Sequence, residues 1–136
     1  MDKKIKAYVD TSAFISALDR SDTYHPLFAQ RFAAPPPLIT TPLVIAEGQG
    51  WFLKRYDTMR ALQFMSFIER LSVLTILPAD MKMVREATRL LRQFSDQDLS
   101  LTDAAGLWTM KRHGITHCWS TDRHLALAGA SLAIYE

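Results

Sequence analysis

The sequence has little of what marks a secreted, membrane-bound or repetitive protein. Cys118 is its only cysteine, so no disulfide can form within the chain, and a small residue in a predicted buried strand is its simplest interpretation. There is no signal-peptide segment, no apolar run near the length of a membrane span, and no repeat or low-complexity tract. We therefore expect one domain over residues 1–136, soluble and cytoplasmic, without membrane association.

A strong net charge is also missing, because 16 basic and 14 acidic residues leave a formal net charge of only +2. That balance alone says little about partners. Ten of the sixteen basic residues are arginine, whose planar side chain suits phosphate groups. If the acids gather at one place in the fold, the remaining surface is more basic than the net charge suggests. Solvated helix surfaces explain any single arginine equally well.

Strand and helix patterns alternate along the chain. The predicted strands are 4–9, 38–40, 73–77, 115–119 and 132–135, and the predicted helices are 12–19, 23–33, 42–56, 58–71, 81–94, 100–113 and 123–128. Two helices are expected between the first and second strands, and two more between the second and third. Such alternation implies right-handed crossovers. We expect an α/β fold with a mainly parallel four- to five-stranded sheet flanked by helices on both faces.

Several residues are typical of helix starts. Pro42 suits the first turn of the third helix, and Asp22, Asp57 and Asp80 can cap the helices that follow them. The helix predicted at 58–71 carries more apolar side chains than packing on a sheet alone requires. Core packing is the simpler explanation for these side chains, and a homodimer surface is the alternative.

Four carboxylates lie at predicted junctions of strands and helices. They are Asp10, Glu47, Asp103 and Asp122. Asp10 follows the first predicted strand, and Asp122 follows the fourth. Ligands of open parallel sheets bind at the carboxyl ends of the strands, so these two acids are placed for chemistry. Because Mg²⁺ and Mn²⁺ prefer carboxylate oxygens, the pattern predicts a metal site.

Capping is an alternative interpretation for three of these acids. Asp10 can form a turn or cap, and Asp122 can cap the short helix after it. Ser100 and Asp103 have the spacing of a capping box, in which the acid reaches back to the N–H of the cap residue. A further acid, Asp98, lies in a polar loop where a solvated turn residue is the expectation.

Glu47 is too deep in its helix to be a cap. It lies among apolar neighbours, so its carboxylate requires a partner. Gly48 and Gly50 weaken the helix beside it and would let another backbone or a ligand come close. Close packing between two helices explains these glycines equally well.

In their order and on these elements, the four acids resemble the PIN-domain family, Mg²⁺-dependent nucleases that include the VapC toxins of bacterial toxin–antitoxin pairs. The resemblance covers essentially the whole chain. It depends on Tyr8-Val9-Asp10-Thr11-Ser12-Ala13-Phe14, on Glu47 in the helix after Thr41-Pro42, on Leu99-Ser100-Leu101-Thr102-Asp103-Ala104, and on Ser120-Thr121-Asp122-Arg123-His124. The family implies a single PIN-like domain, an RNA substrate, a Mg²⁺ or Mn²⁺ cofactor and a VapB-like antitoxin partner.

Transferred position by position, the resemblance also implies roles for individual residues. The catalytic and metal-binding acids would be Asp10, Glu47, Asp103 and Asp122. The accompanying hydroxyls would come from Thr11 or Ser12 and from Ser120 or Thr121. Asp10 and Asp103 are expected as direct ligands, Glu47 as a ligand or the group that orients water, and Asp122 as a second-metal or water-mediated contact.

The expected chemistry also follows from the acids themselves. Four converging carboxylates repel one another, which either raises a pKa or is relieved by divalent cations. A bound cation would lower the pKa of a water molecule and favour in-line attack on a phosphodiester. Arg20, Lys54, Arg123 and His124 are candidate RNA phosphate contacts by their positions in the chain. His124 as a general base is a weaker interpretation, because metal-activated water needs none.

Two other function classes are alternatives for this sequence. A phosphoryl-transfer domain also carries acids at parallel strand ends, but here no second Asp follows two residues after Asp10, and no lysine follows the fourth strand at Asp122. The other class is a catalytically inactive PIN-like module that binds RNA or protein, with its acids serving as caps. Metal binding that depends on Asp10 would separate the enzyme from this module.

Overall fold

Five short parallel strands form the central sheet of the protein, which the computed structural model describes over residues 4–136. The strands are β1 (Ala7–Val9), β2 (Leu38–Thr40), β3 (Leu74–Ile76), β4 (His117–Trp119) and β5 (Ser131–Leu132). Their order is β3-β2-β1-β4-β5, and every neighbouring pair is parallel. The predicted α/β class is confirmed. The first three residues of the expected domain lie outside the described part of the chain.

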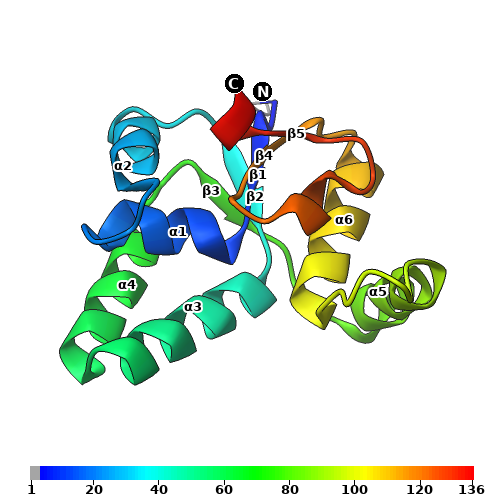
Figure 1. The fold of residues 1–136 in the computed structure, drawn as a ribbon, viewed down its shortest axis with the longest axis horizontal. Helices are drawn as coiled ribbons and strands as arrows, with labels where there is room; N and C mark the ends of the chain where they lie inside the picture. Colours follow the sequence, from blue (N-terminus) through cyan, green and yellow to red (C-terminus); the bar gives the residue numbers. More distant parts are fainter. Residues whose placement is uncertain (1–3) are drawn as a thin grey trace.

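Helices cover both faces of this sheet. Figure 1 shows α1, α2 and α4 on one side with α3 running below them, and α6 on the other side with α5 packed outside it. Their bounds are α1 (Thr11–Leu18), α2 (His25–Ala33), α3 (Pro42–Arg55), α4 (Thr58–Arg70), α5 (Met81–Gln93) and α6 (Leu101–His113), followed by the 3₁₀ helices η1 (Arg123–Ala126) and η2 (Ala133–Tyr135). Between residues 4 and 136, no helix has the length and apolar character needed to cross a membrane.

The core is closed by aromatic side chains on the α1 side of the sheet. The Phe14 ring stacks on Phe32 with 5.4 Å between centroids and meets the edge of Phe64 at 6.1 Å. Burial of a phenylalanine contributes about 2–3 kcal/mol. These contacts join α1, α2 and α4, so the apolar face predicted for the fourth helix packs into the core through Phe64 and Ile68.

Gly48 allows α3 and α4 to pack closely. A Cβ atom at this position would lie 2.5 Å from Cζ of Phe64, a ring that is fully buried. Of the two explanations considered for this glycine, helix packing is therefore the one that the structure shows. A Cβ at Gly50 would meet nothing within 4 Å, so packing gives no reason for a glycine there.

Predicted element boundaries fail mainly at the end of the chain. The predicted strand 132–135 is wrong after Leu132, because residues 133–135 form a 3₁₀ helix. β5 is an edge strand that pairs with β4 only through Ser131 and Leu132, so no further ladder bonds keep the chain extended. The short helix predicted at 123–128 is a 3₁₀ helix that ends at Ala126.

Two of the three predicted aspartate caps are confirmed. Asp57 and Asp80 each accept a hydrogen bond of 2.9 Å from the backbone N–H three residues further on. The prediction for Asp22 is wrong, because α2 begins at His25 and its N-cap residue is Tyr24. Asp22 instead accepts hydrogen bonds from the Ser16 hydroxyl and the Tyr24 N–H, both at 2.8 Å, and so closes the turn between α1 and α2.

Candidate active site

The predicted acids line one cavity at the carboxyl ends of β1 and β4, where the strand order of the sheet changes direction. Asp10 follows β1 directly, Asp122 precedes η1 after β4, Asp103 lies in the first turn of α6, and Glu47 lies in α3. The cavity has a volume of about 670 Å³. Its other lining residues are Thr11, Ser12, Ile15, Gly50, Trp51, Leu53 and Lys54.

Two serines from opposite ends of the chain hold the Asp10 side chain. The Ser120 hydroxyl donates to Asp10 Oδ2 at 2.8 Å, and the Ser12 hydroxyl donates to the same oxygen at 3.1 Å. Each serine oxygen also accepts a backbone N–H, from Asp122 to Ser120 and from Thr121 to Ser12. The two serine oxygens also lie 3.1 Å apart, so one hydroxyl can donate to the other while the other donates to Asp10. Both serines engage Oδ2, and neither occupies Oδ1.

Asp10 makes no side-chain capping bond to α1, although it is the N-cap residue of that helix. Only 4% of the residue is exposed. Burial raises the pKa of its carboxyl from 3.8 to about 6; the Ser120 hydrogen bond opposes this rise, and the charge of Asp103 adds to it. The Asp10 carboxylate is therefore held at an energetic cost that a nearby cation would reduce.

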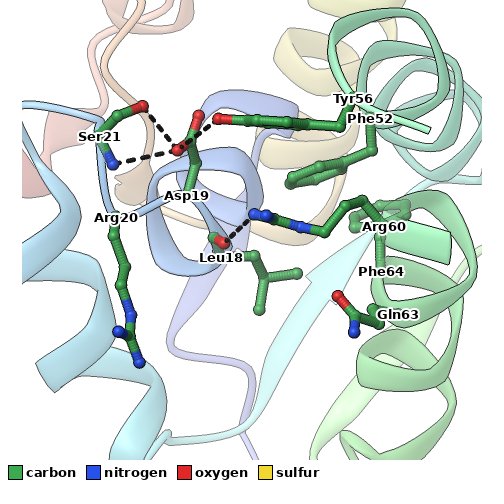
Figure 2. Close-up of a pocket in the computed structure, with 9 residues that line it drawn as sticks. All are labelled: Leu18, Asp19, Arg20, Ser21, Phe52, Tyr56, Arg60, Gln63 and Phe64. Atoms are coloured by element: carbon green, nitrogen blue, oxygen red, sulfur yellow. Dashed lines mark hydrogen bonds between the residues drawn. The ribbon is translucent and has the colours of Figure 1, made fainter.

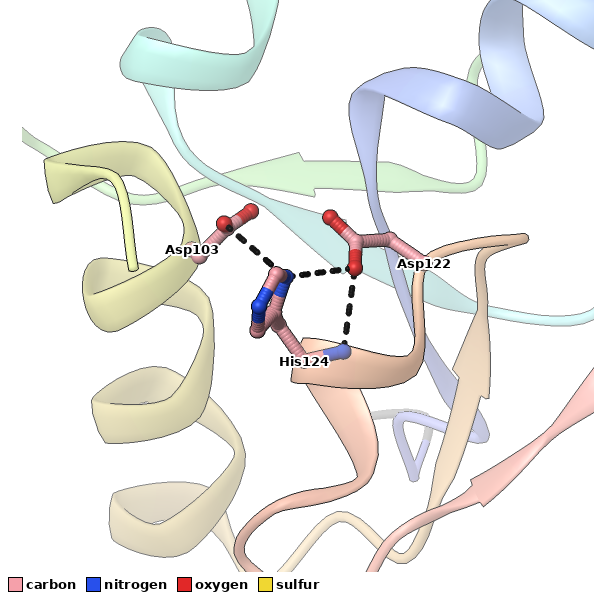
Figure 3. Close-up of side chains that lie close together, drawn as sticks. All are labelled: Asp103, Asp122 and His124. Carbon is pink, nitrogen blue, oxygen red and sulfur yellow. Dashed lines mark hydrogen bonds and ion pairs between the residues drawn. The ribbon is translucent and has the colours of Figure 1, made fainter. Parts of the chain in front are cut away.

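Asp103, Asp122 and His124 form a compact cluster (Figure 3), and its two acids line the same cavity as Asp10. His124 Nδ1 lies 2.8 Å from Asp122 Oδ1 and 4.0 Å from Asp103 Oδ2. One possible ligand atom from each of the three residues lies within 4.8 Å of the other two. The carboxylate oxygens at this spacing fit a shared divalent cation, and the imidazole nitrogen fits one only when the ring is neutral.

The charges and hydrogen bonds within the cluster, together with burial, shift the pKa values of Asp103 and His124. Desolvation raises the pKa of Asp103, and the charge of Asp122 raises it further, while hydrogen bonds with Ser100 and the charge of His124 act against the rise. Desolvation lowers the pKa of His124, but the charge and hydrogen bond of Asp122 outweigh it, and the net pKa lies above 6.5. This shift favours the protonated, positively charged form of His124 beside the acids.

Asp103 serves both interpretations that the sequence left open. Its Oδ2 accepts the Ser100 N–H at 3.4 Å, while its own N–H donates to the Ser100 hydroxyl at 3.1 Å, which completes the predicted capping box. The same carboxylate lines the cavity and contacts His124. Capping therefore holds the Asp103 side chain at the start of α6, in position for the cluster.

The cavity also brings together groups on α3. Glu47 and Lys54 line it, so the predicted acid and one predicted phosphate contact share this wall. Sequence reasoning missed Trp51, which lies one helical turn after Glu47 and also lines the cavity. The sequence did contain a signal for Trp51, because it follows Glu47, a predicted site residue, by four residues and so lies on the same side of the helix. Leu53, 46% exposed, adds a second apolar side chain there.

A family model for the PIN domain matches residues 7–130. The chain belongs to the PIN domain family. A search of curated protein sequences finds no significant match.

Solved structures support the PIN domain fold. The toxin VapC20 of Mycobacterium tuberculosis, described as cleaving the Sarcin-Ricin loop, is 21% identical with a TM-score of 0.83, covering 93% of this chain and 97% of its own. PAE2754 from Pyrobaculum aerophilum is 19% identical with a TM-score of 0.64, at 96% and 92% coverage. A toxin–antitoxin complex from Klebsiella pneumoniae is 16% identical with a TM-score of 0.61, at 93% and 95% coverage.

Not every predicted site residue of this PIN domain lies in the acidic cavity. Thr11 lines the cavity, but its hydroxyl is buried without a hydrogen-bond partner among the described residues. Thr121 does not line the cavity and contacts Ser12 only through its backbone N–H. Arg123 is exposed and does not line the cavity. Arg20 lines a different cavity of about 520 Å³ beyond the end of α1.

Figure 2 shows that second cavity of the PIN domain, in which Asp19 is the centre of a hydrogen-bond network. Asp19 Oδ1 accepts the Ser21 hydroxyl at 2.7 Å, the Ser21 N–H at 3.0 Å and the Tyr56 hydroxyl at 2.9 Å. Burial acts to raise the pKa of Asp19, but these hydrogen bonds and the nearby charge of Arg60 bring it below 3.8. Asp19 is thus satisfied within the protein, and its lowered pKa contrasts with the raised pKa of Asp10 and of Asp103 in the first cavity.

Proposed function

We propose that this PIN domain is a divalent-metal-dependent endoribonuclease and the toxin of a VapBC-type toxin–antitoxin pair. The observation that carries the proposal is the convergence of Asp10, Glu47, Asp103 and Asp122 on one cavity at the switch point of the sheet, with His124 against Asp122. A cation bound between these acids would relieve their mutual repulsion.

Each acid has a role in this proposal. Asp10, Asp103 and Asp122 hold the cation, with Glu47 as a further ligand or the group that orients the attacking water. When bound, Mg²⁺ or Mn²⁺ supplies charge neutralisation at the phosphodiester and activates water for its hydrolysis. Ser12 and Ser120 are positioning residues, because they hold the carboxylate of Asp10 by hydrogen bonds to a single oxygen.

The walls of the cavity support a nucleic acid as substrate. Trp51 offers an aromatic face for a base, and Lys54 offers a positive charge for a phosphate two helical turns after Glu47. The raised pKa of His124 favours its protonated form, which adds a positive charge beside the Asp122 carboxylate. RNA is proposed over DNA because the chain resembles VapC toxins in fold.

A protein partner is part of the same proposal. One structural neighbour is a toxin–antitoxin complex, which supports a VapB-like antitoxin for this chain. Expression should be toxic in a host that lacks the partner, and the Asp10→Asn variant should be harmless. Equal toxicity of the two proteins would contradict the proposed biological role, which places the protein in the cytoplasm with its RNA target.

RNA cleavage tests the enzymatic part of the proposal. The purified protein should cleave RNA with Mg²⁺ or Mn²⁺ and stop when EDTA is added. Asp103→Asn should lower the rate by orders of magnitude, because asparagine keeps the shape of the side chain and its capping ability but removes the charge. Asp98→Asn is the matched control: Asp98 lies in the loop before α6, exposed and outside the cavity.

Two results would contradict the proposed metal-dependent endoribonuclease activity. Cleavage that survives complete chelation would exclude metal dependence. RNA binding without cleavage in any divalent metal would favour a catalytically inactive PIN-like module, in which Asp103 is only a helix cap.

A further inference from the structure

Helix α5 carries a row of basic side chains that the proposed active site does not use. Lys82, Arg85, Arg89 and Arg92 are all exposed and follow one another at intervals of three or four residues. At about 100° per residue their directions fall within roughly 80° of one another, on the side opposite the buried Met83 and Ala87. The four side chains therefore form one stripe along the outer face of α5, which we call the α5 basic stripe.

The charge of this stripe is not balanced on its own helix. Glu86 is the one acid within Met81–Gln93. It reaches Arg89 at 3.8 Å, but the Arg89 side chain is 77% exposed, and an exposed pair at this distance binds weakly. Two further acids, Asp96 and Asp98, follow in the loop after the helix. Asp80 precedes the helix and lines the small cavity at its start together with Lys82. Among the described residues none of these acids forms an ion pair with Lys82, Arg85 or Arg92, so these three side chains present their charge to solvent.

Helix stability does not explain the stripe. Like charges three or four residues apart repel one another on a helix, and Lys82 lies in the first turn, where a positive charge opposes the helix dipole. A solvated surface helix is normally stabilised by acids alternating with bases. The repeated cations are instead suited to an external polyanion, because each one can neutralise a phosphate.

The stripe begins at the active-site end of the molecule. α5 and α6 pack together as an antiparallel pair, since Lys82 and Met83 at the start of α5 share a small cavity with Trp108 and Arg112 near the end of α6. The other end of α5, with Arg92, is therefore the end nearest the start of α6, where the acids lie. Helix α5 lies at the outer edge of the molecule (Figure 1), and the stripe extends for about 15 Å along this helix.

Basic groups continue past the far end of α5. Arg112 and His113 lie beside Lys82 around the small cavity, and the guanidinium of Arg112 lies 5.3 Å from the centre of the Trp108 ring. Lys111 is exposed on the same turn of α6. The positive surface therefore follows the α5–α6 pair from one end to the other.

We infer that the α5 basic stripe binds the phosphate backbone of the RNA outside the active-site cavity. This inference rests on the proposed function for its substrate class, and it adds a second contact surface to the cavity. The stripe offers charge without a pocket for bases, so it would hold RNA of any sequence and leave base recognition to other parts of the protein.

Salt dependence of RNA binding tests the stripe directly. Lys82, Arg85 and Arg92 are changed together to Gln in the Asp10→Asn protein, which is expected to bind RNA without cutting it. Binding to a labelled single-stranded RNA of about 20 nucleotides is then measured over a range of salt. Loss of three phosphate contacts should reduce the slope of log K against log salt by about 2. The unmodified stripe should therefore lose about 20-fold more affinity than the variant over a roughly fourfold rise in salt.

A charge-conserving variant at the same positions is the matched control. Lys82→Arg, Arg85→Lys and Arg92→Lys together should keep the full salt slope, because counterion release depends on charge and not on side-chain shape. The Gln variant should melt at the same temperature as the parent or higher, since it removes repulsion along the helix. A shallower slope in a fully folded protein is then an effect on RNA binding.

A second control removes the same charge elsewhere. Lys4, Lys6 and Arg70, exposed and outside α5, are changed together to Gln and should leave the slope unchanged. Equal slopes for the parent and the α5 Gln variant would overturn the inference, and so would an equal loss in both Gln variants.

Cleavage assays on the same α5 substitutions with Asp10 intact separate the two proposals. If the parent cleaves RNA and the α5 variant binds RNA with an unchanged slope, the stripe is excluded and the proposed function stands. If the stripe sets the salt slope but no divalent metal supports cleavage, the stripe stands and the proposed function fails. If neither protein binds RNA, both proposals are overturned.

Discussion

Asparagine in place of Asp10 should stabilise the metal-free protein at neutral pH. Burial raises the pKa of this carboxyl from 3.8 to about 6 in the folded protein. At about 1.4 kcal/mol per pKa unit, ionised Asp10 destabilises the fold by up to about 3 kcal/mol relative to its protonated form. Asparagine keeps an oxygen that can accept from Ser12 and Ser120, but these hydrogen bonds weaken without the charge. We therefore expect a net gain of about 1–2 kcal/mol at pH 7.

The sign of the pH dependence follows from the same shift. Between pH 3.8 and about 6, the folded protein holds a proton on Asp10 that the unfolded chain has already released. The folded state then binds more protons, so the contribution of Asp10 to stability falls as pH rises through this range. The advantage of Asp10→Asn should be small or absent near pH 4 and complete above about pH 6. Asp19, whose pKa is lowered, acts in the opposite direction in both proteins.

Urea denaturation in EDTA, measured from pH 4 to pH 8, gives the difference in unfolding free energy between parent and variant. Taking the difference cancels Asp19 and the other groups that titrate in both proteins. Saturating Mn²⁺ should then stabilise the parent by mass action and the variant much less. A variant that is less stable than the parent at pH 7, with a difference that does not change with pH, would refute a buried, destabilised carboxylate at this position.

Two further predictions concern packing and hydrogen bonding elsewhere. Gly48→Ala should destabilise the fold by about 1–3 kcal/mol, because the new methyl group would overlap the buried Phe64 ring. Gly50→Ala in the same helix should instead stabilise the fold by up to about 1 kcal/mol through helix propensity. Thermal melts of the two variants measure this difference, and equal effects would contradict the packing role of Gly48. Tyr56→Phe should lower the free energy of unfolding by about 1–2 kcal/mol and raise the pKa of Asp19, because it removes a hydrogen-bond donor to that carboxylate. NMR titration of Asp19 measures the rise in pKa. An unchanged pKa would show that the hydrogen bond contributes nothing.

Local patterns account for the parts of the fold that the sequence predicted well. Strand and helix periodicities, proline at the start of α3 and the aspartates before α4 and α5 act over a few residues, so each element could be located from its own segment. Where an element depends on a distant partner, prediction was less accurate. β5 illustrates this, because its length depends on how far β4 runs beside it.

The side-chain partners within the site could not be predicted. Ser12 and Ser120 are 108 residues apart in sequence and bind the same oxygen of Asp10. His124 was considered as a phosphate contact, and the structure places it against Asp122 in the acidic cluster. Which hydroxyl points inward depends on side-chain rotation at each position, and sequence spacing alone does not determine that.

The sequence by itself determined the order of strands and helices and placed the acids near strand ends and helix starts, because these features arise from short-range backbone preferences and the alternation of the two element types. Only the tertiary structure decided which charges face the cavity. Arg20 shows the reason: α1 has eight residues, so it carries the chain about 12 Å away from Asp10 before Arg20 is reached. Trp51 and Lys54 instead lie on the turns of α3 that pack across the open ends of the strands, and packing alone brings them to the acids.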